Sequence, residues 1–240
     1  MERLQSITVL GGSAASSFSN DQDLSWPYLL KASLPSHIEF RVETRGGLTF
    51  VRAISELADF PDEDLLILHF GTSIGWPTSV VQLGHKLGVD FTGEFAFHQP
   101  AYRSSSFMKR IKRAFKVRVR NTVKYLLFFT GRYKSRISRR EIDDQIKAVV
   151  QLAKSQSKRI IWIQHQALQN RRIFLERRSY QRYYREIIES LKKYESVDFQ
   201  LLTLPDEFLV QENYLLDSVH LSRLGHQELH KLVREAYKRF

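Results

Sequence analysis

The stretch ITVLGGSAAS, residues 7–16, runs from the mainly apolar residues Ile-Thr-Val-Leu directly into two glycines, a serine and further small residues. The apolar run is typical of a buried strand, and the glycines predict that the strand ends in a tight turn. A hydroxyl at this place has two interpretations. Ser13 is either a small turn residue, which is the commoner case, or a nucleophile at the carboxyl end of a strand. Residues elsewhere in the chain decide between them.

The overall composition is that of an ordinary globular protein. Its 240 residues, 42% of them hydrophobic, suffice for one substantial core. The chain has no cysteine, which excludes disulfides and thiolate metal sites. No segment approaches the roughly 18 apolar residues of a membrane-spanning helix, and the N-terminal apolar stretch is too short for a signal peptide. The sequence therefore predicts a soluble, cytoplasmic protein.

Basic residues are concentrated in one segment. Residues 101–140 contain 14 of the 37 Lys and Arg residues and no Asp or Glu. The other 200 residues hold 23 basic and 26 acidic side chains, a balance of −3. The net charge of +11 thus comes from this segment. Any inference from charge to an anionic partner depends on it alone.

The remaining chain alternates between two kinds of pattern. Five apolar runs rich in β-branched residues predict buried strands at 6–10, 38–42, 65–70, 159–163 and 199–202. The intervening and final segments predict helices at 24–31, 50–57, 141–154, 180–194 and 221–240. Such alternation favours a doubly wound α/β fold, with a five-stranded parallel sheet covered on both faces. We expect one domain over 1–240 with a basic helical insertion at about 98–140.

Small and polar residues follow the predicted strands. Glycine-rich segments lie at 11–13, 45–49 and 71–75, and the loop before the last helix contains Asp217 and His220. Active groups in doubly wound sheets gather just beyond the carboxyl ends of the strands. We therefore expect these segments to meet at one edge of the sheet.

Ser13, Asp217 and His220 are the residue types that nucleophilic catalysis needs. A serine hydroxyl becomes an effective nucleophile when an imidazole accepts its proton, and a carboxylate holds that imidazole in the right tautomer. Neighbouring glycines let backbone N–H groups approach a developing oxyanion. Each signal is weak alone, but their occurrence together at the first and last strand ends favours a catalytic triad.

The arrangement resembles the SGNH (GDSL-type) serine hydrolase family over nearly the whole chain outside the insert. The Gly-Asp-Ser block of that family matches Gly11-Gly12-Ser13, and its Asp-x-x-His block matches Asp217 and His220. Gly47 corresponds to the glycine of the second block, and Gly71-Thr72-Ser73 to the Gly-x-Asn block. The resemblance implies a flavodoxin-like, SGNH-type fold and serine esterase activity.

The resemblance also implies an oxyanion hole formed by the backbone N–H groups of Ser13 and Gly47 and the side chain of Ser73. Two positions depart from the family pattern, because Gly12 replaces an aspartate and Ser73 replaces an asparagine. The serine hydroxyl is a shorter donor, and loss of one oxyanion donor typically lowers turnover by about 10²–10³. Low activity, a different donor, or a catalytically inactive relative that only binds a ligand all stay open.

Metal binding has no support in the sequence. Histidines other than His220 follow no metal-ligand spacing such as H-E-x-x-H. His165, at the end of the fourth predicted strand, has no paired ligand nearby and is interpreted as structural. We predict neither a metal nor another cofactor.

The basic insert has a pattern of its own. Phe107, Ile111 and Phe115 recur at helical spacing among basic residues, which predicts a basic amphipathic helix. It is interpreted either as a cap on the sheet edge or as an arm over 103–140 that binds an anionic partner. The candidate binding residues are Arg110, Arg113, Lys116, Arg118 and Arg120. A membrane surface or a phosphorylated carrier fits such an arm, whereas nucleic acid ranks lower because no recognition motif accompanies the charges.

Two functions are therefore open. The first is an SGNH-type esterase or deacylase that removes or transfers an O-acyl group. Its pattern resembles proteins of bacterial surface-polysaccharide synthesis, which favours a saccharide ester as substrate. The second is a catalytically weak or inactive module that binds an anionic glycan, a lipid carrier or a membrane surface through its insert. An arm of this kind favours a peripheral location at the inner face of the membrane.

Overall fold

The structure, a computed structural model, describes residues 4–16, 22–46, 48–71, 139–166, 177–215 and 220–240, together with Thr122 and Leu126. The chain divides into two compact units, Met1–Ile74 with Arg139–Phe240, and Gly75–Ser138. The second unit contains most of the predicted insert but begins earlier, at Gly75. Thr122 and Leu126 are helical. The predicted amphipathic helix around 107–115 lies outside the described residues.

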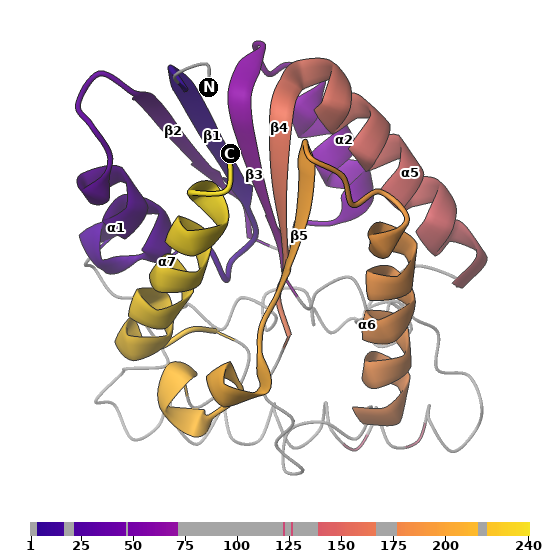
Figure 1. The fold of residues 1–240 in the computed structure, drawn as a ribbon. Helices are drawn as coiled ribbons and strands as arrows, with labels where there is room; N and C mark the ends of the chain where they lie inside the picture. Colours follow the sequence, from indigo (N-terminus) through magenta and orange to yellow (C-terminus); the bar gives the residue numbers. More distant parts are fainter. Residues whose placement is uncertain are drawn as a thin grey trace, which may run out of the picture. The chain divides into compact units, whose positions relative to one another are not determined.

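The first unit contains a five-stranded, all-parallel sheet with the strand order β2-β1-β3-β4-β5 (Figure 1). The strands are β1 (Ser6–Gly11), β2 (Glu39–Thr44), β3 (Glu63–Phe70), β4 (Ser157–Gln164) and β5 (Phe199–Thr203). The chain reverses its direction of travel across the sheet between β1 and β3, which makes their carboxyl ends the topological switch point. The predicted doubly wound fold is confirmed.

Helices cover both faces of this sheet. They are α1 (Trp26–Ser33), α2 (Phe50–Leu57), α5 (Arg139–Gln156), α6 (Arg177–Lys192) and α7 (Arg223–Tyr237), with short 3-10 helices at Gln22–Leu24, Asp206–Phe208 and Gln211–Asn213. Helices α1 and α7 pack together on one face, whereas α2 and α5 pack together on the other (Figure 1). This distribution is the doubly wound arrangement in which short β–α connections alternate between the faces.

Element boundaries differ from the predictions by a few residues, for local reasons. Strand β3 begins at Glu63 rather than Leu65, because the Glu63 carboxylate is buried and accepts a hydrogen bond from Thr8 Oγ1 at 2.8 Å. Helix α7 begins at Arg223 rather than 221, because Ser222 caps it by accepting a hydrogen bond from Gly225 N at 3.1 Å. Helix α1 begins at Trp26 rather than 24, with Pro27 in its first turn.

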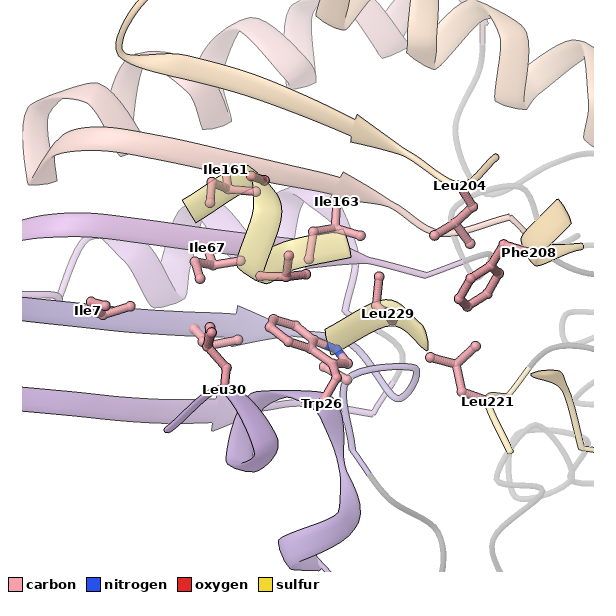
Figure 2. Packing of buried hydrophobic residues seen from close by; sticks show 14 of the residues in the cluster. Ile7, Trp26, Leu30, Ile67, Ile161, Ile163, Leu204, Phe208, Leu221 and Leu229 are labelled. Carbon is pink, nitrogen blue, oxygen red and sulfur yellow. The ribbon is translucent and has the colours of Figure 1, made fainter. Parts of the chain in front are cut away.

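A continuous apolar core lies between the sheet and the α1–α7 layer. Alternate residues of the strands, such as Ile67 and Ile161, meet Trp26 of α1 and Leu229 of α7 there (Figure 2). All four of these side chains are fully buried. Figure 2 shows Trp26 near the arrowhead of β1, so this core extends to the carboxyl edge of the sheet.

The opposite face has an aromatic core. Phe50 of α2 contacts Phe70 with ring centroids 4.9 Å apart, and Phe70 contacts Trp162 at 4.6 Å. The sheet is therefore packed on both sides, which explains the nearly unbroken apolar runs of its central strands. Among the residues that the structure describes, no helix is long and apolar enough to cross a membrane.

Candidate functional site

The turn after β1 fixes the position of Ser13. Gly12 N donates a hydrogen bond to the carbonyl oxygen of His69 at 2.9 Å, and Arg45 N donates to Gly11 O at 2.8 Å. A Cβ atom on Gly11 would lie 2.3 Å from the Cβ of Ala15, because the chain folds back tightly onto itself. A glycine is thus required at position 11, because a side chain there would clash with Ala15. The turn places Ser13 just beyond the carboxyl end of β1.

The loop before α7 fixes the position of His220. Tyr214 and Leu221 form an antiparallel bridge, and Leu215 N donates to the carbonyl oxygen of His220 at 2.7 Å. The base of this loop also packs closely on α7, since a Cβ on Gly225 would lie 2.0 Å from the carbonyl oxygen of Asn213. These contacts anchor the backbone on both sides of the segment that carries His220.

The structure brings Ser13 and His220 together. Ser13 Oγ lies 3.1 Å from His220 Nε2, although 207 positions separate the two residues in the sequence. His220 is 2% exposed and Ser13 is half-buried. The hydroxyl donates this hydrogen bond when the imidazole carries its proton on Nδ1, so Nε2 is placed to accept a proton from the hydroxyl.

The other predicted site residues lie outside the described residues. These are Asp217, the oxyanion-hole residues Gly47 and Ser73, and the anionic-ligand residues Arg110, Arg113, Lys116, Arg118 and Arg120. Their roles stay predictions. Within the described ranges, no group of three or more His, Asp or Glu side chains is arranged to hold a metal ion.

Sequence reasoning missed a cluster of buried histidines next to this pair. His69 and His165 are fully buried and His226 is 3% exposed. The rings of His69 and His165 have centroids 5.5 Å apart, and His165 also contacts the ring of Tyr214 at 5.8 Å. One sequence signal could have indicated that His69 is buried. It lies two residues after Ile67 along β3, and alternate strand residues share one face.

Trp26 forms hydrogen bonds with two of these histidines. Its indole Nε1–H donates to His69 Nδ1 at 3.1 Å, and its backbone N–H donates to His226 Nδ1 at 3.3 Å. Burial, and secondarily the neighbouring His165, lowers the pKa of His226 to about 4 and the pKa of His69 well below its ordinary value. Both rings are therefore neutral at neutral pH, as acceptance of an N–H hydrogen bond at Nδ1 requires.

Comparison with known proteins finds similarity at the level of the fold. No protein-family model matches the sequence, and no curated protein matches it. A solved structure from Veillonella parvula, described as a member of the lipolytic protein G-D-S-L family, matches with a TM-score of 0.59 and 12% identity over 98% of this chain and 100% of that chain. This chain therefore shares its fold with that protein.

Two further solved structures give the same result. An acetyl xylan esterase matches with a TM-score of 0.56 and 13% identity, over 96% of this chain and 98% of that chain. A lipase/acylhydrolase from Enterococcus faecalis matches with a TM-score of 0.56 and 13% identity, over 98% of this chain and 97% of that chain. The SGNH-type fold that the resemblance implied is thus confirmed.

Proposed function

We propose that this protein is a serine ester hydrolase of the SGNH type. Ser13 is the nucleophile, His220 is the general base and then the general acid, and Asp217 orients the imidazole. The observation that carries the proposal is the 3.1 Å separation of Ser13 Oγ and His220 Nε2 at the carboxyl edge of the sheet. That separation is within the reach of direct proton transfer.

The reaction follows from these positions. Ser13 Oγ attacks the ester carbonyl carbon while its proton passes to His220 Nε2, which gives a tetrahedral intermediate. The backbone N–H groups of Ser13 and Gly47 and the Ser73 hydroxyl stabilise its oxyanion. The bond to the alcohol oxygen breaks as His220 returns the proton to that oxygen. Water then attacks the carbonyl carbon of the acyl-Ser13 ester while His220 takes its proton, and the bond to Ser13 Oγ breaks as His220 passes that proton to Oγ, which releases the free acid.

The proposed substrate is an O-acylated saccharide. The likeness in fold to an acetyl xylan esterase supports this choice. A saccharide hydroxyl that replaced water in the second step would make the same machinery an acyltransferase, because the acyl-Ser13 ester reacts with either oxygen nucleophile. Acetylated and de-acetylated glycans offered together with an acyl donor separate the two outcomes by whether free acid or a new ester is formed.

Labelling and hydrolysis assays test the proposed nucleophile. A fluorophosphonate probe should label the wild-type protein, and p-nitrophenyl acetate should be hydrolysed by it. Ser13→Ala should lose both, whereas Ser155→Ala is a matched control, since Ser155 is exposed at the end of α5 and donates only to Leu152 O at 2.8 Å. Equal labelling of wild type and Ser13→Ala would exclude Ser13 as the nucleophile.

A second candidate function is supported by the charge distribution. The segment 101–140 contains 14 basic and no acidic residues, which favours attraction to an anionic glycan, a phosphorylated lipid carrier or a membrane surface. Charge reversal at Arg110 and Arg113 should weaken binding to anionic vesicles in a salt-sensitive way. The same variant should hydrolyse p-nitrophenyl acetate at nearly the wild-type rate. A protein that binds such ligands and shows no Ser13-dependent reaction would be a binding module.

A further inference from the structure

Trp26 connects the two elements that position Ser13 and His220. One of its donors, the indole N–H, reaches His69 on β3, and the other, the backbone N–H, reaches His226 on α7. Trp26 is the first residue of α1, where backbone N–H groups have no partner within the helix. Ser25, at the N-cap, makes no side-chain capping bond. His226 Nδ1 therefore accepts a hydrogen bond from a backbone N–H group that has no partner within α1.

These bonds belong to a closed path through the site. From Ser13 the path runs to Gly12, whose N–H donates to the backbone oxygen of His69 at 2.9 Å. It passes through the His69 ring to Trp26 and on to the ring of His226. His226 N donates to the carbonyl oxygen of Ser222 at 3.0 Å. Ser222 lies two residues after His220. The contact between His220 Nε2 and Ser13 Oγ closes the path.

The path determines the tautomers of both buried histidines. Each Nδ1 accepts an N–H hydrogen bond, so in each neutral ring the proton is on Nε2. A ring protonated on Nδ1 would place an N–H against the N–H of Trp26 and break the bond. Among the described residues, His69 Nε2 is buried and has no hydrogen-bond partner, so the hydrogen bond from Trp26 to Nδ1 is what orients the polar atoms of the His69 ring.

We propose that Trp26, His69 and His226 are positioning residues that hold Ser13 and His220 at the distance needed for proton transfer. The inference rests on the proposed esterase function. None of the three side chains is required to touch the substrate. They act because a shift of β3 relative to α7 would stretch the two hydrogen bonds that Trp26 makes to His69 and His226. A displacement of about 1 Å at a reacting pair can cost about 10²-fold in rate.

Three substitutions test this role through kinetics. His226→Leu removes the acceptor for Trp26 N, whereas His226→Asn keeps an acceptor oxygen near the position of Nδ1. We expect His226→Leu to lower kcat for p-nitrophenyl acetate by about 10–100-fold with KM changed less than about 2-fold, and His226→Asn to recover most of the loss. Trp26→Phe, which keeps an aromatic side chain but removes the indole N–H, should lower kcat in the same way.

His230→Asn is the matched control, because His230 lies one turn further along α7 and contacts Ser33 Oγ at 3.4 Å rather than Trp26. It should leave kcat unchanged. Wild-type kcat in folded His226→Leu would overturn the proposal, and so would equal losses in His226→Leu and His226→Asn. Urea unfolding of each variant checks that it is folded at the assay temperature.

A second measurement does not depend on activity. Nitrogen-15 NMR of labelled histidines distinguishes a bare Nδ1 from a protonated one. We expect bare Nδ1 in His69 and His226 of the wild type at pH 7.5, and a changed His69 signal in Trp26→Phe. Protonated Nδ1 in either ring would overturn the proposed network. If these signals are as expected but the wild type shows no Ser13-dependent reaction, the proposed function fails while the hydrogen-bond network stands.

Discussion

The polar side chains next to the central strands differ between the two edges of the parallel sheet. At the carboxyl edge, His69 and His226 are buried and neutral and bind to Trp26. At the amino edge, polar groups are charged and paired. Asp64 there accepts hydrogen bonds from the Lys158 ammonium at 2.9 Å and from Gln5 N at 2.7 Å.

The contrast has a physical cause. The Lys158 ammonium and, to a smaller extent, the Gln5 N–H group lower the pKa of Asp64, so its carboxylate stays charged at the amino edge of the sheet. A hollow of about 590 Å³ opens at this edge beside Asp64 and Lys158. At the carboxyl edge, burial makes charge costly and lowers the pKa of His226 to about 4. His69 and His226 therefore stay neutral beside the pair of Ser13 and His220.

The largest expected effect is on ester hydrolysis, which should depend on the carboxyl edge and not on the amino edge. His220→Gln removes the proposed general base and should lower kcat/KM for p-nitrophenyl acetate by about 10³-fold. Lys158→Met changes the opposite edge and should stay within about 2-fold of wild type. Steady-state hydrolysis of the ester measures both. Comparable losses in the two variants would mean that activity does not distinguish the edges.

The next effect concerns stability in acid. The pKa of His226 falls from 6.5 in the unfolded chain to about 4 in the folded protein. Between these pH values the unfolded chain binds more protons, so the free energy of unfolding decreases as the pH is lowered. One such histidine contributes a loss of roughly 3 kcal/mol between pH 6.5 and 4.

Urea unfolding at pH 7.5 and pH 4.5 measures this loss. His226→Asn cannot take up the proton and should lose about 2 kcal/mol less than the wild type on acidification. His37→Asn, which changes an exposed histidine, should keep the wild-type pH dependence. Identical pH dependence in wild type and His226→Asn would mean that the His226 ring does not resist protonation in the folded protein.

A smaller effect comes from close packing at the carboxyl edge. Gly225→Ala places a Cβ 2.0 Å from the carbonyl oxygen of Asn213, which is much closer than van der Waals contact allows. We expect a loss of about 2 kcal/mol in the free energy of unfolding, measured in urea. Activity should fall as well, because the displaced backbone is the base of the loop that carries His220. A variant as stable as the wild type would show that this contact has room to relax.

Much of this architecture could be predicted from the sequence. The strands were predictable because buried parallel strands consist of apolar, β-branched runs. The predictions missed some strand ends because charged or polar residues there, such as Glu63, still pair with the neighbouring strand. The approach of Ser13 and His220 was predictable because each follows an element that ends at the same sheet edge. The roles of Gly47, Ser73 and Asp217 stay predictions.

The histidine network could not be predicted in the same way. The alternation along β3 places His69 on the core face beside Ile67, but periodicity does not identify its partner. Trp26 and His226 are 200 positions apart, and their contact depends on how α1 and α7 pack against each other. For a single histidine on an apolar face, the sequence does not show whether its ring forms a specific hydrogen bond or is only buried.

The smallest expected effect belongs to the amino edge. Lys158→Met removes the ion pair with Asp64 but keeps an aliphatic side chain, and Lys158 is largely exposed. Because Asp64 has a lowered pKa in the folded protein, its contribution to stability is present above pH 3.8 and disappears as the pH falls through its folded pKa. We expect the variant to lose less than about 1 kcal/mol at pH 7, and this loss should shrink as the pH falls through the folded pKa of Asp64. A larger loss in urea unfolding at pH 7 would show that the charged edge, like the neutral one, depends on individual contacts.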